Sequence, residues 1–197
     1  MSIAAETVKQ LRDATGAGMM DAKKALEETG GDYDKAIEWL RQKGESKAEK
    51  RAERSAESGM VHAYVHMDRV GAMVEVNCET DFVARTEDFQ NFVHDVAMHV
   101  AAAQPEYLTS DDVPESVVEK EKDVYKSELE GKPEDVQDKI MSGKLDKFYE
   151  GVCLLKQPFI KDPDKTIEDY QTELIAKLGE NIVIARFERM ELGESHE

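Results

Sequence analysis

An acid, a large aromatic and a base lie within five residues of one another at Asp81, Phe82 and Arg85. A carboxylate and a guanidinium form strong hydrogen bonds with polar groups, and an exposed phenylalanine offers a large apolar surface. The stretch is therefore a candidate loop for presenting side chains to a partner. In the alternative interpretation, Phe82 packs into the protein's own core and Asp81 caps the next helix. The residue types alone favour neither.

The elements on either side place this stretch at a junction between a strand and a helix. Residues 70–78 alternate, with Ala72, Val74, Val76 and Cys78 on one face, which is the period of a strand. Residues 89–100 carry apolar side chains at helical spacing instead. The chain must turn between the two elements, and the acid, the aromatic and the base lie at that turn.

Two motifs resemble the signatures of the bacterial elongation factor Ts family. The first is the junction itself, Glu75–Ala84, which reads EVNCETDFVA. The second is Leu11–Leu26, which reads LRDATGAGMMDAKKAL and is similar to the family's opening segment. Both lie in the family's order and at its separation. Shorter similarities at residues 99–103, 157–159 and 184–187 extend the resemblance over nearly the whole chain.

The resemblance implies a translation elongation factor that acts on another protein, elongation factor Tu. Such a factor binds elongation factor Tu with GDP and promotes GDP release by displacing the magnesium ion, which allows GTP to load. The displacing element would be Thr80, Asp81, Phe82 and Val83, with Phe82 inserted between helices of the partner. A non-catalytic binding scaffold or chaperone for elongation factor Tu fits the same residues.

Residues 1–45 are predicted to form a three-helix bundle. Apolar residues recur at helical spacing in three segments, glycines separate the segments, and Asp32 is a natural N-cap for the last helix. The bundle resembles ubiquitin-associated domains, and in the family this module docks on the GTP-binding domain of the partner. The resemblance therefore assigns Gly18, Met19 and Met20 to docking. Trp39 either joins that exposed apolar patch or packs in the bundle core. The bundle alone would also permit an adaptor without exchange activity.

The remaining chain is predicted to hold a charged linker and one core domain. Residues 46–58 have no large apolar side chain and alternate acids with bases, so they form a solvated helix or linker. Residues 59–197 form the elongation factor Ts core, or dimerisation, domain. Its first strand alternates from Gly59, with Val61, Ala63, Val65 and Met67 on one face, and pairs with residues 70–78 as a hairpin with one apolar face.

The rest of the core is predicted to be helical except for its last strand. Two charged helices near residues 117–129 and 133–148 suggest a helical hairpin, with Pro133 at the first helical position and a tip at Gly131–Pro133. A helix from about Thr166 ends at Gly179, and residues 182–190 form a strand that joins the hairpin. The predicted fold class is α+β, a small antiparallel sheet covered by helices with a helical hairpin insertion.

Composition argues against several classes of function. The formal net charge of −17 opposes phosphate-neutralising contact with nucleic acid and binding to an anionic membrane. The spacing of residues contains no phosphate loop, metal site, redox pair or nucleophile with a base, so we expect neither an enzyme nor a cofactor. Cys78 and Cys153 lie in apolar stretches and are expected to be buried free thiols. No signal peptide or long apolar run is present, so a cytoplasmic protein is expected.

The chain carries only one copy of the junction motif. The longer members of the family have a core of two related halves, whereas this chain shows a single strand pair with one Asn-Cys-Glu-Thr-Asp-Phe junction. It is similar to the shorter members, some of which pair two copies to rebuild the missing half. The resemblance therefore predicts a homodimer.

Overall fold

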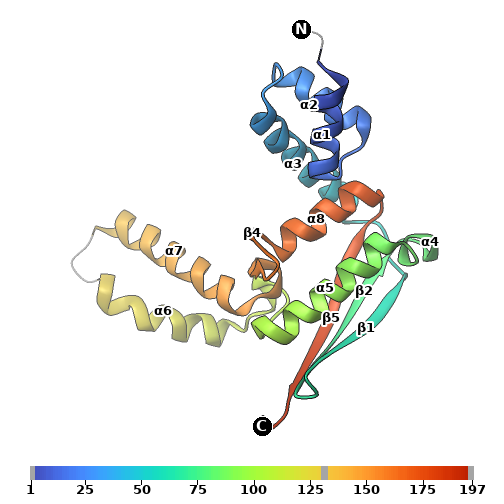
Figure 1. The fold of residues 1–197 in the computed structure, drawn as a ribbon. Coiled ribbons are helices and arrows are strands. Elements are labelled where there is room, and N and C mark those ends of the chain that lie inside the picture. Colours follow the sequence, from blue (N-terminus) through green and yellow to red (C-terminus); the bar gives the residue numbers. More distant parts are fainter. Residues whose placement is uncertain (1–2, 130–132, 195–197) are drawn as a thin grey trace. The chain divides into compact units, whose positions relative to one another are not determined.

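A computed structural model describes residues 3–129 and 133–194 and contains both helices and strands (Figure 1). The turn predicted at Gly131–Lys132 lies outside the described residues. The α-helices are α1 (Ala5–Thr15), α2 (Met19–Glu28), α3 (Tyr33–Glu49), α4 (Asp81–Ala84), α5 (Glu87–Ala103), α6 (Glu115–Leu129), α7 (Glu134–Val152) and α8 (Ile167–Leu178), and the short 3-10 helices are η1 (Ser110–Asp112) and η2 (Leu154–Lys156).

The strands form one three-stranded and one two-stranded sheet. They are β1 (Ser58–His66), β2 (Val70–Cys78), β3 (Pro158–Phe159), β4 (Asp162–Thr166) and β5 (Ile182–Glu191), in the orders β1-β2-β5 and β3-β4. The β3–β4 pair is antiparallel and was not predicted, because β3 has too few residues to show a period. The mixture of helices with a small sheet confirms the α+β fold class.

The chain divides into two compact units, each discontinuous in sequence. The first comprises Met1–Val61, Glu75–Val93 and Asp169–Ala185. The second comprises His62–Val74, His94–Glu168 and Arg186–Glu197. Residues 79–85, which connect β2 to α5, lie entirely within the first unit.

The N-terminal helices form the predicted bundle within the first unit. Its buried side chains come from all three helices and are Val8, Leu11, Ala22, Ala25, Leu26 and Ala36. Asp32 caps α3 as predicted and accepts a hydrogen bond from the Lys35 amide at 3.1 Å. Trp39 is partly buried against this core, beneath the Lys43 ammonium. Helix α3 continues to Glu49, into the segment predicted to be a solvated helix or linker, because the charged residues there are good helix formers.

The β1–β2 hairpin has the predicted strands, but their apolar faces lie on opposite sides. Ala72, Val74, Val76 and Cys78 of β2 are buried as predicted. On β1 the half-buried side chains include His62 and Tyr64, whereas Val61 and Val65 are 59% and 61% exposed. The edge of the His94 ring contacts the His62 and Tyr64 rings, and these contacts hold the aromatic side of β1 inward. One apolar surface of the hairpin is therefore left exposed.

The helical hairpin is present as α6 and α7 in the second unit. Pro133 is the N-cap of α7, one position before the helical position that was predicted for it. Half-buried side chains join the two helices, and the Lys144 ammonium lies 4.7 Å from the centre of the Tyr125 ring. Val124 on α6 is exposed.

His99 is a fully buried polar side chain in the second unit. The Gln157 amide nitrogen donates to the Gly151 carbonyl at 2.8 Å, so the Gln157 carbonyl must accept from His99 Nε2, 2.9 Å away. The other ring nitrogen accepts from the Ile160 amide at 3.4 Å. Burial lowers the pKa of the imidazole, and the hydrogen bond to Gln157 offsets only part of that effect.

Acidification should therefore destabilise the protein through His99. Because the folded-state pKa lies below the unfolded value near 6.5, the unfolded chain takes up a proton first, and stability falls as pH drops below about 6.5. Urea unfolding at pH 7.5 and 5.5 should show a larger loss of stability for the wild type than for His99→Gln. An equal loss in the two proteins would show that His99 is not the titrating group.

Candidate functional site

The junction between β2 and α5 is a single helical turn, α4, rather than an irregular loop. Its N-cap is Thr80, whose hydroxyl oxygen accepts the Val83 amide hydrogen at 3.4 Å. The alternative in which Asp81 caps the helix is therefore wrong, because Asp81 is already inside the first turn. Threonine performs this function because its short side chain reaches the free amide groups of the helix start.

Phe82 points away from the protein's own core. Its side chain is 80% exposed, which excludes the alternative in which it packs inside. The neighbouring Asp81 is also exposed and forms an ion pair with Arg85 at 2.8 Å. An exposed pair at this spacing contributes only a few tenths of a kcal/mol, roughly 0.3–0.5, so it adds little to the stability of α4. The acid, the aromatic and the base are thus brought together on one exposed turn.

The residues before α4 are tied to the turn between α8 and β5. The Thr80 amide and hydroxyl both donate to the Glu180 carboxylate, at 3.0 and 2.6 Å. In return, the Asn181 amide donates to the Glu79 carboxylate at 2.6 Å. The contacts of Glu79, Glu180 and Asn181 were not predicted, because no local pattern marks a contact between segments about 100 residues apart.

Cys78 supports the same junction from inside. Its thiol is buried and donates to the Thr80 carbonyl, with 3.1 Å between sulfur and oxygen. Burial raises the thiol pKa, and the nearby Glu180 carboxylate raises it further, so the group stays protonated. Both cysteines are buried and free, as predicted, which makes Cys78 a packing residue rather than a nucleophile.

The N-terminal motif places Gly18, Met19 and Met20 at the start of α2. Gly18 is the N-cap, and Met19 and Met20 are 47% and 73% exposed. Asp21 fixes α2 against α3 by accepting from Lys43 and Lys47, each at 2.7 Å. These two hydrogen bonds lower the pKa of the Asp21 carboxyl.

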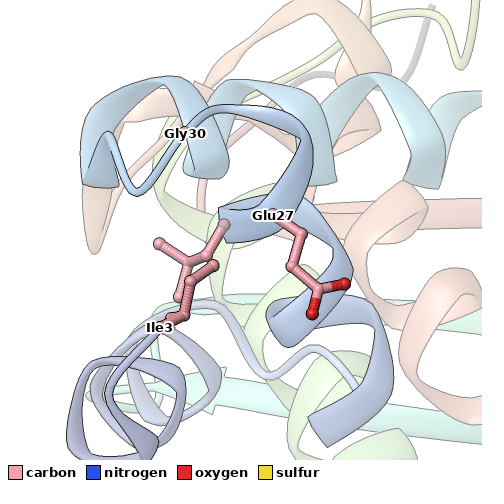
Figure 2. Close-up of a pocket in the computed structure, with 4 residues that line it drawn as sticks. Ile3, Glu27 and Gly30 are labelled. Carbon is pink, nitrogen blue, oxygen red and sulfur yellow. The ribbon is translucent and has the colours of Figure 1, made fainter. Parts of the chain in front are cut away.

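A pocket of about 320 Å³ lies elsewhere in the same bundle. Figure 2 shows Ile3, Glu27 and Gly30 around it, and Leu26 completes the lining. Its one charged side chain, Glu27, faces Lys23 at 3.6 Å on the same helix. With one carboxylate and no second polar side chain in its lining, the pocket has no group of residues that could perform acid–base or nucleophilic chemistry.

Two histidines that are distant in sequence meet in the second unit. His62 Nε2 and His94 Nδ1 lie 3.1 Å apart, so one ring donates to the other. Burial lowers the pKa of His62, and the His94 ring adds to the effect.

Within residues 3–129 and 133–194, no three His, Cys, Asp or Glu side chains gather in a way that could hold a metal ion. In that same part of the chain, no helix is long and apolar enough to cross a membrane.

Comparison with known proteins decides the family. The profile of the family described as elongation factor TS matches residues 2–173. The chain belongs to the elongation factor Ts family. The elongation factor Ts of Thermodesulfovibrio yellowstonii is 54% identical over 198 residues, which cover 100% of both chains. That of Moorella thermoacetica is 58% identical over 98% of this chain and 96% of its own. That of Carboxydothermus hydrogenoformans is 56% identical over 98% of this chain and 90% of its own.

Membership of the elongation factor Ts family makes this chain a translation elongation factor. Both motifs lie inside the region that the family profile matches. Strand β5 lies beyond that region, but the Thermodesulfovibrio relative is similar along the full length of the chain and so includes it. The Glu180–Asn181 turn therefore belongs to the part of the fold shared with full-length elongation factor Ts relatives.

Proposed function

We propose that this chain is a guanine nucleotide exchange factor for elongation factor Tu and has no catalytic residues of its own. It binds the GDP-bound partner, displaces the magnesium ion and so promotes GDP release and GTP loading. The observation that carries this proposal is the exposed Phe82 at the tip of α4, flanked by Asp81, in a chain of the elongation factor Ts family. An aromatic side chain that its own protein leaves 80% exposed is available for insertion into a partner.

Exchange by this route requires a difference in affinity. The factor must bind nucleotide-free elongation factor Tu more tightly than the GDP-bound form, and by linkage the nucleotide weakens binding of the factor to the same extent. The four residues Thr80, Asp81, Phe82 and Val83 form the displacing element. Thr80 caps the turn, Phe82 inserts, and Asp81 with Val83 contacts the elements that position the ion.

The N-terminal bundle supplies the docking energy in this proposal. Gly18, Met19 and Met20 contact the GTP-binding domain of elongation factor Tu, and the exposure of both methionine side chains supports that role. Methionine adapts its shape to an apolar partner surface. The proposed domains are a ubiquitin-associated-like module over residues 1–45, a charged linker over 46–58 and the core over 59–197. The proposed location is the cytoplasm, where translation takes place.

A homodimer is the proposed assembly, and the exposed apolar surface of the β1–β2 hairpin supports it. In the second unit this surface includes Val65, Met67 and Met73, all more than half exposed. Light scattering should give twice the chain mass for the wild type and the monomer mass for Val65→Glu, since the substitution would bury a charge at the interface. Val124→Glu, which changes an exposed valine of α6, should remain dimeric. A strictly monomeric wild type with full exchange activity would contradict the homodimer.

Stopped-flow release of a fluorescent GDP from elongation factor Tu tests the proposed function. Increasing concentrations of the chain should raise the release rate to a plateau. If the chain binds elongation factor Tu but leaves the rate unchanged, it is a scaffold or chaperone for that partner, and the exchange proposal is wrong.

A further inference from the structure

Glu180 accepts two hydrogen bonds from the residue that caps α4. The Thr80 amide lies 3.0 Å from one carboxylate oxygen, and the Thr80 hydroxyl lies 2.6 Å from the other. Hydrogen bonds to an ionised carboxylate are roughly twice as strong as neutral ones. The Thr80 hydroxyl donates its hydrogen to Glu180. Its oxygen lone pairs then point toward the helix start, and the oxygen accepts the Val83 amide hydrogen at 3.4 Å. Glu180 therefore sets the orientation of the cap.

A second carboxylate makes the reciprocal contact. Glu79, one residue before Thr80, accepts from the Asn181 amide at 2.6 Å and lies 3.5 Å from the Arg54 guanidinium. The Asn181 side chain is buried and donates to the Arg54 carbonyl at 2.8 Å. The residues before α4 and the turn between α8 and β5 thus each donate a backbone amide to a carboxylate of the other segment. We call this pair of contacts, Glu79 to Asn181 and Glu180 to Thr80, the clasp.

Helix α4 needs such an anchor because of its length. It has four residues, and isolated helices shorter than about 12 residues are marginal in water. The exposed Asp81–Arg85 pair contributes little, and the Phe82 side chain, 80% exposed, buries little surface that could hold the turn. The contacts at its start include the clasp, the Thr80 cap on the Val83 amide and the Cys78 thiol, which donates to the Thr80 carbonyl.

Gly179 forms the turn that places the Glu180 side chain beside Thr80. It ends α8 with a φ of +81°, a left-handed conformation that glycine adopts without cost, and its amide donates to the Ile175 carbonyl at 2.9 Å. The turn is therefore fixed to a helix whose Ile175 is buried, and the Glu180 carboxylate projects from a rigid support.

We propose that Glu180 is a positioning residue for exchange, holding α4 through Thr80 so that Phe82 is presented in one orientation. The inference rests on the proposed function, because the orientation of Phe82 matters only if Phe82 inserts into elongation factor Tu. Glu180 itself does not touch the partner in this proposal. It acts by reducing the number of orientations from which insertion must start.

Amide hydrogen exchange, followed by NMR on the isolated chain, tests the positioning directly. In Glu180→Ala the amides of Thr80 and Val83 should exchange at least about tenfold faster than in the wild type, since each depends on the clasp or on the Thr80 cap. The amide of Val96 in the middle of α5 should be unaffected and reports that the variant is folded. Unchanged rates at Thr80 and Val83 would overturn the proposal whether or not the chain promotes nucleotide exchange.

GDP release from elongation factor Tu then tests the consequence. Glu180→Ala should lower the plateau rate by about tenfold or more. The concentration at half-plateau should change less, because docking through Met19 and Met20 is intact. Glu180→Gln should recover to within about threefold of the wild type, because its carbonyl accepts the Thr80 amide and its amide donates to the Thr80 hydroxyl.

The matched control variant changes an exposed glutamate on α7. Glu150→Gln, on the exposed side of α7, should match the wild type. A Glu180→Gln variant that releases GDP as slowly as Glu180→Ala, while its Thr80 and Val83 amides exchange as in the wild type, would show that charge rather than positioning matters, and would overturn the proposal. A wild type that fails to accelerate release refutes the proposed function instead, and the amide exchange rates then decide whether Glu180 positions α4.

Discussion

Replacing Phe82 with alanine should slow the GDP release that this chain promotes by about tenfold to a hundredfold. Burying a phenylalanine side chain in a partner contributes about 1.5–3 kcal/mol, and each 1.4 kcal/mol corresponds to about a factor of ten. An overall acceleration of about ten-thousandfold would need roughly 5.5 kcal/mol of preference for the nucleotide-free partner. Phe82 therefore cannot supply the whole effect, and Phe82→Ala should retain a measurable acceleration that the remaining contacts provide.

The same variant should leave folding stability unchanged, which separates a binding defect from a folding defect. The Phe82 ring is exposed, so its removal creates no cavity in the core. Val124→Ala is a suitable control, since Val124 is also an exposed apolar side chain but lies on α6. Release rates of both variants should be measured by stopped-flow fluorescence at saturating concentrations. If Phe82→Ala promotes release as fast as the wild type, Phe82 is not the displacing residue.

Replacing Gly59 with alanine should destabilise the protein by about 2–4 kcal/mol, because both the backbone conformation and the neighbouring strand exclude a side chain. Gly59 has a φ of +145°, which L residues rarely adopt. An added Cβ would lie 2.2 Å from the Val76 carbonyl oxygen and 2.8 Å from the Asn77 Cα, and both are backbone atoms. The start of β1 would have to move away from β2 immediately before the junction, so GDP release should slow as well. Urea unfolding monitored by circular dichroism measures the loss of stability.

Gly143→Ala provides the opposite control. Gly143 lies inside α7, and apart from its chain neighbours and the backbone of its own helix a Cβ there would meet no atom within 4 Å among the described residues. Alanine in a helix interior is more favourable than glycine by about 0.5–1 kcal/mol, so this variant should be more stable than the wild type. If Gly59→Ala is as stable as the wild type, then the close approach of β1 to β2 at Gly59 does not occur in solution.

Local periodicity was sufficient to predict several elements with accurate bounds. Strand β2 occupies Val70–Cys78, as its strict alternation predicts, and its apolar side is the buried side. Helix α5 covers residues 89–100, whose spacing predicted a helix, and ends at Ala103, where Gln104 takes a φ of +53° and Pro105 follows. Both elements were predicted because their apolar residues recur at the period of a strand or a helix, and this period can be seen within the element's own sequence.

Features that depend on distant parts of the chain could not be predicted. The alternation of β1 was read correctly, but not which side faces inward, because His94 on α5 decides it by contacting His62 and Tyr64. The clasp joins Thr80 to Glu180 across 100 residues, and neither Glu180 nor Asn181 carries a local signal. The capping residue was not settled by the sequence either: Asp81 was one open alternative and Thr80 was not considered, since sequence places a helix start only to within one or two residues.

The pair of dissociation constants of this chain for GDP-bound and nucleotide-free elongation factor Tu tests the central claim most directly. Isothermal titration calorimetry can measure both, with the GDP-bound form at saturating magnesium and GDP. Nucleotide exchange through the junction predicts that the nucleotide-free form binds at least about a hundredfold more tightly, because a factor can shift an equilibrium only by its differential affinity. Equal affinities for the two forms would contradict the claim, since a protein that binds both equally cannot promote GDP release through its binding energy.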